Sequence, residues 1–372
     1  MFLYVKLKLP PEGYFVRDLT LSFIVLTMQL GDQVHIGYDY MDDSFEIKFE
    51  KTRTIYDVLN IAKDILEDKI ASKLRSPMMN INDINYVLKR IVGVKAKLTY
   101  NDLMVKVLEK AISQRNLNLE ELKVVSETRS PSAVSVVLGN REVTAIQPFK
   151  IESYEKALAL NKPYSLKYEM RLSKTWYTIL AAGYALAYSG FTGGEMVFIS
   201  PTLTTLIKTL EHDIPYNILP SILTTATSLN VVPEPKIAYL LYLALVLSES
   251  YRYVQTLGFF NIVLTRIALA QNVYTLYERT EANLEPLMSF ISKVRNECSK
   301  DLKYALRRTL NPRTYDSKLA TFATLLYEGI FKSKPPYETV YYGVREEIKV
   351  NSETRRIISS KECAKKLWDE LQ

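Results

Sequence analysis

Three aspartates stand close together near the beginning of the sequence, at Asp39, Asp42 and Asp43. Paired carboxylates can hold two magnesium ions for phosphoryl transfer, and the segment Tyr40-Met41-Asp42-Asp43 has the letters of such a site. That chemistry also needs a further aspartate on an earlier strand and a preceding subdomain, but only 39 residues precede Tyr40. We therefore expect a polar turn here. A metal-dependent nuclease that uses these three aspartates remains a minor alternative.

Other motifs of catalytic chemistry are weak. The sequence has only two histidines, His35 and His212, so a histidine-based triad or a zinc site has almost no side chains to draw on. The dipeptide His212-Asp213 occurs in metal-dependent phosphohydrolases, but their fold needs further histidines. The glycines within residues 190–194 lack the Gly-Lys-Ser/Thr ending of a phosphate-binding loop. We expect neither enzymatic activity nor a cofactor.

Lysines and arginines that could bind phosphate gather in the last fifth of the sequence. Arginine suits bidentate contacts to phosphate or guanine. Two more arginines flank the dipeptide Gly139-Asn140, which suits a two-residue hairpin turn. Glu346 and Glu347 interleave with the C-terminal set, so a solvated helix face with intrahelical ion pairs is an equal alternative. The candidate nucleic-acid-binding residues are Lys303, Arg307, Arg308, Arg313, Arg345, Lys349, Arg355, Arg356, Arg129 and Arg141.

The net charge of the chain is positive and unevenly distributed. The 372 residues carry a formal charge of +7, with 4 basic and 8 acidic residues in residues 1–50 but 17 basic and 11 acidic ones in residues 293–372. A basic pole of this size is consistent with a polyanionic partner, because phosphate neutralisation dominates affinity for nucleic acids. It is also common in proteins that bind no anion. The content of 48% hydrophobic and 24% charged residues is that of a folded globular protein.

The cysteines and the apolar runs bear on the cellular compartment. Cys298 and Cys363 lie 65 positions apart without a Cys-x-x-Cys pattern, and we expect neither a disulfide nor a zinc site. The first residues do not have the pattern of a signal peptide. The longest apolar run, residues 237–247, has 11 residues and is shorter than the roughly 20 that span a bilayer. We predict a buried core helix at this run, no membrane partner and a cytoplasmic location.

The hydrophobic pattern of residues 1–150 predicts a mixture of strands and helices. Apolar alternation predicts strands at residues 19–26, 34–38 and 45–49. Spacing of three and four residues predicts helices over residues 54–74, 84–92 and 101–113. Asn101 is the expected N-cap of the last of these. Two further strands, at residues 133–138 and 142–146, are expected to form a hairpin about Gly139-Asn140.

Beyond residue 151 the pattern becomes almost wholly helical. Helices are expected over residues 173–188, 203–210, 218–229, 236–254, 261–277, 284–310 and 316–331, with a short strand at 196–200. Pro335-Pro336 breaks the chain before a basic helical tail that runs to residue 372. This change of pattern predicts an α+β fold with a mixed domain of residues 1–150 and a mainly helical domain of residues 151–372.

The middle of the sequence is similar to a known family of proteins. The segments WYTILAAGYALAY (residues 176–188) and GGEMVFISP (residues 193–201) resemble the large subunit of archaeal type I-A CRISPR interference complexes, known as Cascade. Further segments follow that family in order, at residues 271–279, 284–295, 304–308, 325–331 and 341–346. The likeness covers about residues 170–350. It is a likeness of pattern and order and includes no catalytic motif.

The resemblance implies a non-catalytic subunit of a crRNA-guided complex that surveys DNA in antiviral defence. In that family the large subunit recognises the short motif beside the target, stabilises the opened DNA and presents it to the helicase and nuclease subunits. The expected partners are the backbone and helicase-nuclease subunits, crRNA and target DNA. The likeness identifies no motif-reading residue, so the basic residues named above are predicted from charge alone. A helical scaffold or adaptor that binds only proteins is the alternative function.

Overall fold

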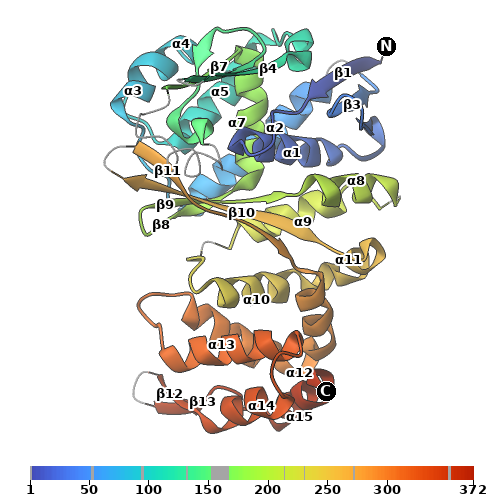
Figure 1. Ribbon diagram of the computed structural model, residues 1–372, viewed down its shortest axis with the longest axis vertical. Helices are drawn as coiled ribbons and strands as arrows, with labels where there is room; N and C mark the ends of the chain where they lie inside the picture. The colour runs from blue at the N-terminus through green and yellow to red at the C-terminus, as the bar shows by residue number, and fades with distance from the viewer. Residues whose placement is uncertain are drawn as a thin grey trace. The chain divides into compact units, whose positions relative to one another are not determined.

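Figure 1 shows the chain in a computed structural model, which describes residues 2–51, 54–93, 96–130, 133–151, 167–212, 214–229, 231–270, 273–350 and 353–372. The chain folds as two compact units. Unit 1 consists of Met1–Ser228 and Ile262–Glu281, and unit 2 consists of Leu229–Asn261 and Ala282–Gln372. The domain boundary that we predict near residue 150 lies inside unit 1.

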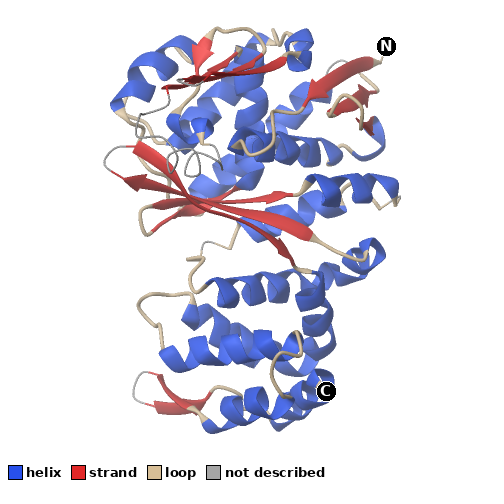
Figure 2. Cartoon of the chain, viewed as in Figure 1, coloured by secondary structure: helices blue, strands red, loops and turns tan. Residues whose placement is uncertain are grey.

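Unit 1 combines several sheets with helices, as the colours of Figure 2 show. Its strands are β1 (Leu3–Lys8), β2 (Val34–Asp39), β3 (Ser44–Phe49), β4 (Val125–Ser130), β5 (Ala133–Leu138), β6 (Val143–Thr144), β7 (Lys167–Leu172), β8 (Tyr188–Thr192), β9 (Glu195–Pro201), β10 (Asn261–Ala270) and β11 (Val273–Asn283). Its helices and helical turns are α1 (Phe15–Met28), η1 (Gly31–Gln33), α2 (Thr54–Ala71), α3 (Ile81–Asp83), η2 (Ile84–Leu88), α4 (Lys89–Ile91), α5 (Tyr100–Gln114), η3 (Leu119–Lys123), η4 (Gln147–Lys150), α7 (Lys174–Ala187), α8 (Leu203–Glu211) and α9 (Ile218–Thr227). Most of the predicted helices of this region are confirmed.

The first sheet is antiparallel, with the strand order β1-β3-β2. Ile47 on the central strand lies opposite Val5 on one side and Ile36 on the other, and all three side chains are buried. Alternate residues of each strand therefore face the core. The strands predicted at residues 34–38 and 45–49 are confirmed.

Helix α1 occupies the segment in which we predicted a strand, residues 19–26. Every residue of α1 is buried, so its sequence shows no polar face, and a short apolar run cannot be assigned to a strand or a helix by periodicity alone. Helix α1 packs against α7. A β-carbon at Gly183 of α7 would lie 1.9 Å from the carbonyl oxygen of Leu19, so only glycine allows this close approach.

Two further details of unit 1 concern helix ends. Helix α5 begins with a capping box in which Thr99 and Asp102 bond each other's backbone N–H groups, so the N-cap is Thr99 and not Asn101 as predicted. The C-terminal end of α7 is capped by the buried ammonium group of Lys69, which donates to the carbonyl oxygens of Ala185 and Tyr188 at 2.8 and 2.7 Å. Burial lowers the pKa of Lys69 to about 7.

The second sheet has the strand order β4-β5-β7-β6, which corrects the hairpin predicted at Gly139-Asn140. Strand β7 lies between β5 and β6, parallel to β5 and antiparallel to β6. The dipeptide therefore connects two strands that are not neighbours. The turn signal is local, whereas the strand that separates the pair begins at Lys167, which the local pattern does not place there.

The third sheet has the order β11-β10-β9-β8, and two of its strands correct the helix predicted over residues 261–277. Strand β10 pairs with β9, for example Leu264 with Ile199, and both side chains are buried. A strand buried on both faces reads as a continuous apolar run rather than an alternation. The strand predicted at residues 196–200 is confirmed as part of β9.

Unit 2 is mainly helical. Its elements are α10 (Lys236–Leu247), η5 (Ser248–Ser250), α11 (Tyr251–Leu257), α12 (Glu285–Thr309), α13 (Ser317–Ile330), α14 (Pro336–Arg345), β12 (Glu347–Val350), β13 (Glu353–Arg356) and α15 (Lys361–Leu371). Helix α12 packs against α10, α13 and α15. The α+β class is confirmed, with mixed elements in the N-terminal region and helices dominating the C-terminal part. A short β-hairpin interrupts the tail that we predicted as helical.

The apolar run of residues 237–247 lies within α10, and most of its side chains are buried, which confirms the predicted core helix. No helix in the described part of the chain is both long and apolar enough to cross a membrane.

A disulfide joins Cys298 of α12 to Cys363 of α15, which contradicts our expectation of no disulfide. The two α-carbons lie 4.8 Å apart, and both side chains are fully buried. Because 65 positions separate the cysteines in the sequence, only the packing of α15 on α12 brings them together. The disulfide therefore fixes the last helix of the chain to the central helix of unit 2.

Candidate nucleic-acid interface

Eight of the ten predicted basic residues lie in unit 2, around the C-terminal end of α12. The hydroxyl of Thr314 donates to the carbonyl oxygen of Arg308 at 3.2 Å, so the turn that carries Arg313 folds back on this end. Arg308 Nη2 donates to the carbonyl oxygen of Lys349 at 3.4 Å, which places the β12–β13 hairpin beside α12. We call these residues the basic cluster: Lys303, Arg307, Arg308, Arg313, Arg345, Lys349, Arg355 and Arg356.

Two members of the basic cluster hold the hairpin in place. The guanidinium of Arg355 lies 4.4 Å from the centre of the Tyr304 ring, and that of Arg308 lies 5.7 Å from the same ring. Arg355 also forms an ion pair with Asp301 at 2.6 Å, and this carboxylate is almost completely buried. Asp301 accepts a further bond from the backbone N–H of Ser359 at 2.9 Å. Arg308 and Arg355 therefore position the β12–β13 hairpin on α12.

The other members of the basic cluster are exposed. Lys303, Arg307 and Arg313 form no ion pair among the residues that the structure describes, and the same holds for Lys349 and Arg356. On the hairpin, Lys349 lies opposite Thr354, two positions from Arg356 across the ladder, on the face away from the buried Ile348. The C-terminal end of a helix dipole also favours cations. These side chains are available to bind an anion.

The exposed face of α12 extends the cluster toward the middle of the helix. Lys300 is exposed and stands three residues before Lys303 and seven before Arg307, so the three side chains share one face. Lys293 lies two turns before Lys300 on the same face and forms an ion pair with Glu370 at 3.6 Å. Our sequence reasoning missed Lys300. Its helical spacing from Lys303 and Arg307 was the signal that could have found it.

Arg345 brings exposed aromatic rings to the edge of the cluster. Its Nη1 donates to the hydroxyl of Tyr341 at 2.8 Å, and its guanidinium lies 5.4 Å from the centre of that ring. Tyr337, one turn earlier on α14, is also exposed, at 56% against 60% for Tyr341. The backbone bond from Ile357 to Glu346 extends the hairpin ladder to the end of this helix. Aromatic rings beside arginines suit contacts with bases and with proteins alike.

Two of the glutamates that interleave with the cluster in the sequence have partners outside it. Glu346 forms an ion pair with Lys318 at 2.8 Å, and Glu362 accepts from the hydroxyl of Ser360, the N-cap of α15. Lys366 forms an intrahelical pair with Glu370 at 2.9 Å. These contacts keep Glu346 and Glu362 from neutralising the exposed cations of α12, whereas Glu347 lies directly opposite Arg356 in the hairpin ladder.

The remaining two predicted residues, Arg129 and Arg141, belong to unit 1. Arg129 lies on β4 and bonds to Glu127 on its own strand and to the hydroxyl of Tyr14 at 3.2 Å. Arg141 is exposed in the connection from β5 to β6. Because these two strands do not pair, the basic hairpin loop that we predicted to flank Gly139-Asn140 is wrong.

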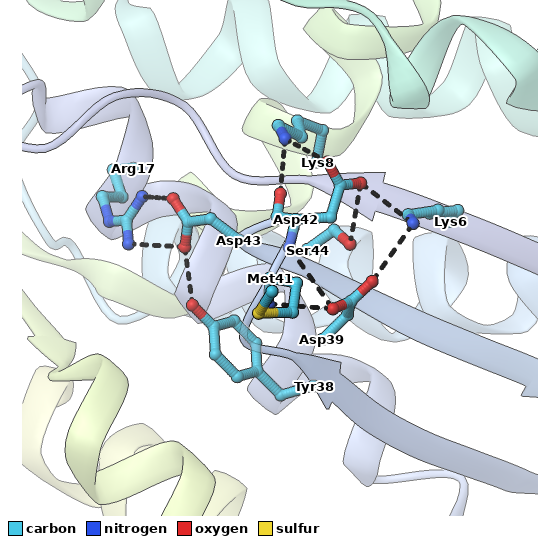
Figure 3. Close-up of polar contacts among 9 residues, drawn as sticks. All are labelled: Lys6, Lys8, Arg17, Tyr38, Asp39, Met41, Asp42, Asp43 and Ser44. Atoms are coloured by element: carbon cyan, nitrogen blue, oxygen red, sulfur yellow. Dashed lines mark hydrogen bonds and ion pairs between the residues drawn. The ribbon is translucent and has the colours of Figure 1, made fainter.

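The three aspartates near the N-terminus form a polar turn between β2 and β3, which confirms that prediction. We call this turn with Asp39, Asp42 and Asp43 the acidic hairpin. Figure 3 shows each carboxylate directed at a cation: Asp42 lies 2.5 Å from Lys8 Nζ and 2.9 Å from Lys6 Nζ. Lys6 also reaches Asp39, at 3.4 Å. The hydrogen bonds from Lys8 and Lys6 lower the pKa of Asp42 to about 2.

Asp43 has the most buried partner in the acidic hairpin. Its two oxygens accept from Arg17 at 2.7 and 3.0 Å, and the hydroxyl of Tyr38 donates to it at 2.7 Å. Burial opposes ionisation of this carboxyl, but the bonds from Arg17 and Tyr38 outweigh it and lower the pKa of Asp43. Within the described residues no group of three or more histidine, cysteine or acidic side chains could hold a metal ion. Asp213, of the second metal motif, lies outside the described residues.

Comparison with known families identifies the chain's relatives. A family model described as "CRISPR-associated protein (Cas_Csx9)" matches residues 40–303, well over half of the chain. The chain belongs to this family. As a CRISPR-associated protein it has a role in CRISPR-Cas defence and acts with other CRISPR components, which confirms the coarser part of our expectation. A comparison with curated proteins gives no match.

The family match bears unevenly on the two charged regions of this CRISPR-associated protein. It begins at Tyr40, in the turn of the acidic hairpin, and ends at Lys303, the first residue of the basic cluster. The other members of the cluster follow the matched segment. Their assignment to nucleic acid therefore depends on their exposure and charge in the structure.

Proposed function

We propose that this CRISPR-associated protein is the non-catalytic large subunit of a crRNA-guided antiviral complex, of the type I-A Cascade kind in archaea. In this role it binds target DNA, both as a duplex and as a single strand, and contributes to recognition of the adjacent motif, to stabilisation of the opened DNA and to recruitment of the helicase-nuclease. Family membership and the likeness of residues 170–350 to such subunits support this assignment.

The observation that carries the proposal is the set of exposed cations on α12 and on the β12–β13 hairpin. Lys303 and Arg307 project from a helix of 25 residues, and Lys349 and Arg356 from a hairpin that Arg308 and Arg355 fasten to it. Cations on such a fixed backbone bind phosphate with little loss of backbone freedom, and phosphate contacts supply most of the affinity for nucleic acid. DNA is therefore the ligand that this surface suits best.

A non-catalytic role is supported by the acidic hairpin. Asp39, Asp42 and Asp43 are the carboxylates that a two-metal nuclease would use, and each of them is held by a lysine or arginine of the same unit. A metal ion would have to displace these cations from all three carboxylates. The proposal accordingly assigns cleavage to another component of the complex.

A scaffold that binds only proteins is the second candidate function. Exposed aromatic side chains on α14 and α15, namely Tyr337, Tyr341 and Trp368, favour it, because aromatic residues are enriched in protein interfaces. Such a scaffold would have negligible affinity for a DNA duplex. The salt dependence of binding separates the two candidates, since only phosphate contacts give a steep one.

The experiment that tests the proposal is affinity isolation of the tagged full chain from its native host, with mass spectrometry of the proteins and sequencing of any bound RNA. We expect CRISPR backbone subunits together with repeat-derived RNA. Recovery of unrelated proteins without nucleic acid would contradict the proposal and favour the scaffold. A Lys303→Ala/Arg307→Ala variant should still assemble, because both side chains are exposed and form no hydrogen bond or ion pair in the described structure.

A further inference from the structure

A second strongly basic surface lies in unit 1. Residues 73–101 contain six lysines and arginines but a single carboxylate, Asp83. Five of these cations are in the described part of the segment, and all five are exposed without an ion-pair partner among the described residues: Lys73, Arg75, Lys89, Arg90 and Lys97. The positive charge of this segment is therefore not used to stabilise the fold.

The single carboxylate of the segment is committed to the interior. Asp83 is buried and accepts a hydrogen bond from the hydroxyl of Tyr100 at 2.8 Å and another from the backbone N–H of Gln147 at 3.2 Å. Asn80 bonds to it as well, at 3.2 Å. These contacts tie the end of α3 to α5 and η4. Asp83 therefore anchors the segment and does not neutralise its exposed cations.

The same segment presents large apolar side chains to solvent. Val87, Leu88 and Ile91 fill its buried face, and Lys110 of α5 donates to the carbonyl oxygen of Ile91 at 2.8 Å. On the outer side, Ile81 is 72% exposed and Tyr86 is 61% exposed. The segment is thus fixed by its inner face, so the exposure of these two side chains is a property of a well-anchored helix.

The exposed apolar and basic side chains alternate along one short stretch. Tyr86, Lys89 and Arg90 lie within five residues of one another in the sequence, and all three side chains are exposed. A β-bridge between Met78, itself 54% exposed, and Thr99 places Lys97 beside the start of α3. A π-helical turn, η2, lies between α3 and α4, and such turns occur often at functional sites. Figure 1 shows α3 and α4 at the outer edge of unit 1. We call the surface formed by these exposed side chains the α3–α4 surface: Met78, Ile81, Tyr86, Lys89, Arg90 and Lys97.

We infer that the α3–α4 surface binds single-stranded nucleic acid, with unpaired bases against Tyr86 and Ile81 and phosphates on Lys89 and Arg90. The single sign of the exposed charge selects a polyanion. Exposed aromatic and aliphatic side chains between the cations suit unpaired bases, which offer a flat apolar face that a duplex encloses. This site is separate from the basic cluster of unit 2 and extends the proposed function to a surface outside it.

The stacking half of this inference is tested by the binding of labelled single-stranded oligonucleotides to the full chain. The same sequence is prepared as DNA, as RNA and as a DNA duplex, and affinity is measured by fluorescence anisotropy. Tyr86→Ala should weaken single-strand binding about tenfold, in keeping with the cost of losing one base–aromatic stack. Tyr86→Phe, the matched control, should keep wild-type affinity, and duplex binding should not change in either variant. A loss of affinity in Tyr86→Ala for single-stranded DNA or RNA supports the inference and shows which of the two nucleic acids is bound.

The phosphate half is tested by the salt dependence of the same binding. Lys89→Ala/Arg90→Ala should reduce the slope of log affinity against log salt concentration by about 1.4, or roughly 0.7 for each lost phosphate contact on a single strand. Unchanged single-strand affinity and slope in both the tyrosine and the double variant, with wild-type circular dichroism, would overturn the inference.

The failure of this inference differs from the failure of the proposed function. If Lys303→Ala/Arg307→Ala weakens duplex binding while the α3–α4 variants bind single strands normally, only the α3–α4 assignment is wrong. If the α3–α4 variants lose single-strand binding while the cluster variant binds duplex normally, the α3–α4 surface is supported and the role of the basic cluster is wrong.

Discussion

The acidic hairpin of unit 1 and the basic cluster of unit 2 are both accumulations of one sign of charge, but their surroundings differ. In the hairpin, each of the three carboxylates forms an ion pair with at least one of Lys6, Lys8 and Arg17. In the cluster, Lys303 and Arg307 form no ion pair among the described residues. A dense run of charge in the sequence therefore has two meanings, and intramolecular partners decide between stabilisation of the fold and availability to a ligand.

The supports of the two regions differ as well. The acidic hairpin is held by ion pairs, which acid removes by protonating the carboxylates. The helix that carries the cluster is held to α15 by the disulfide between Cys298 and Cys363, which acid leaves intact and a reductant cleaves. The comparison therefore predicts that acid and reductant affect different parts of the molecule.

The largest expected effect is that of the disulfide on unit 2. Closing a loop of 65 residues gives about 4 kcal/mol in the chain-entropy model, so Cys298→Ser/Cys363→Ser should lower the free energy of unfolding of unit 2 by roughly that amount. Hydrogen exchange followed by mass spectrometry should show faster exchange in peptides from α12 and α15. Peptides from β1, β2 and β3 serve as the internal control and should exchange as in the wild type. Equal protection of α15 in both proteins would contradict the prediction.

A smaller effect is expected from the buried partner in the acidic hairpin. Asp43→Asn keeps the size of the side chain but leaves Arg17, which is only 8% exposed, without an opposite charge. Because Asp43 itself is partly exposed, we expect a loss of about 2 kcal/mol in the free energy of unfolding of unit 1, below the range for a fully buried pair.

Denaturant unfolding can measure this loss through the fluorescence of Trp176, the tryptophan of unit 1, in a Trp368→Phe background. Asp32→Asn, which changes an exposed carboxylate of the same unit, should alter stability by less than about 0.5 kcal/mol. Equal stability of the Asp43→Asn and Asp32→Asn proteins would refute a role for the Arg17 ion pair.

The smallest effect is the pH dependence of the same hairpin. The pKa of Asp42 is lowered to about 2 by the bonds from Lys8 and Lys6, below the value of about 3.8 in an unfolded chain. Its contribution to stability is therefore fully present above the unfolded value and is lost as the pH falls through about 2. The pKa of Asp39 is lowered too, first by the backbone N–H of Met41. Carboxyl titration by NMR should show Asp42 returning toward the ordinary range in Lys8→Gln, and an unmoved pKa would contradict the ion pair.

Local signals in the sequence were enough for many elements of the fold. Strand alternation at residues 34–38 and 45–49 and helical spacing at 54–74 depend on neighbours within the same element, and the structure confirms them. The errors fall where a distant partner decides. Strand β10 is extended because β9 pairs with it, and Gly139-Asn140 is no hairpin because β7 enters between its strands. No local pattern contains that information.

The candidate site could be predicted in composition but not in roles. Charge alone pointed to the end of α12 and to the C-terminal tail. The sequence could not predict the ion pair between Arg355 and Asp301 or the hydrogen bond from Arg308 to the hairpin, because both depend on the packing of β12–β13 on α12. The α3–α4 surface was missed because the apolar residues of this segment predict only a buried helix face. The structure shows that two of them, Tyr86 and Ile81, are exposed.

The central claim is that the unpaired cations of the basic cluster bind DNA, and the salt dependence of duplex affinity tests it most directly. Lys303→Ala/Arg307→Ala should weaken binding to duplexes of every sequence and reduce the slope of log affinity against log salt concentration by about 1.8, or roughly 0.9 for each lost phosphate contact. Lys361→Ala/Lys365→Ala, which removes two exposed lysines at the same spacing on α15, is the matched control and should keep the wild-type slope. An unchanged slope in the cluster variant would contradict the claim.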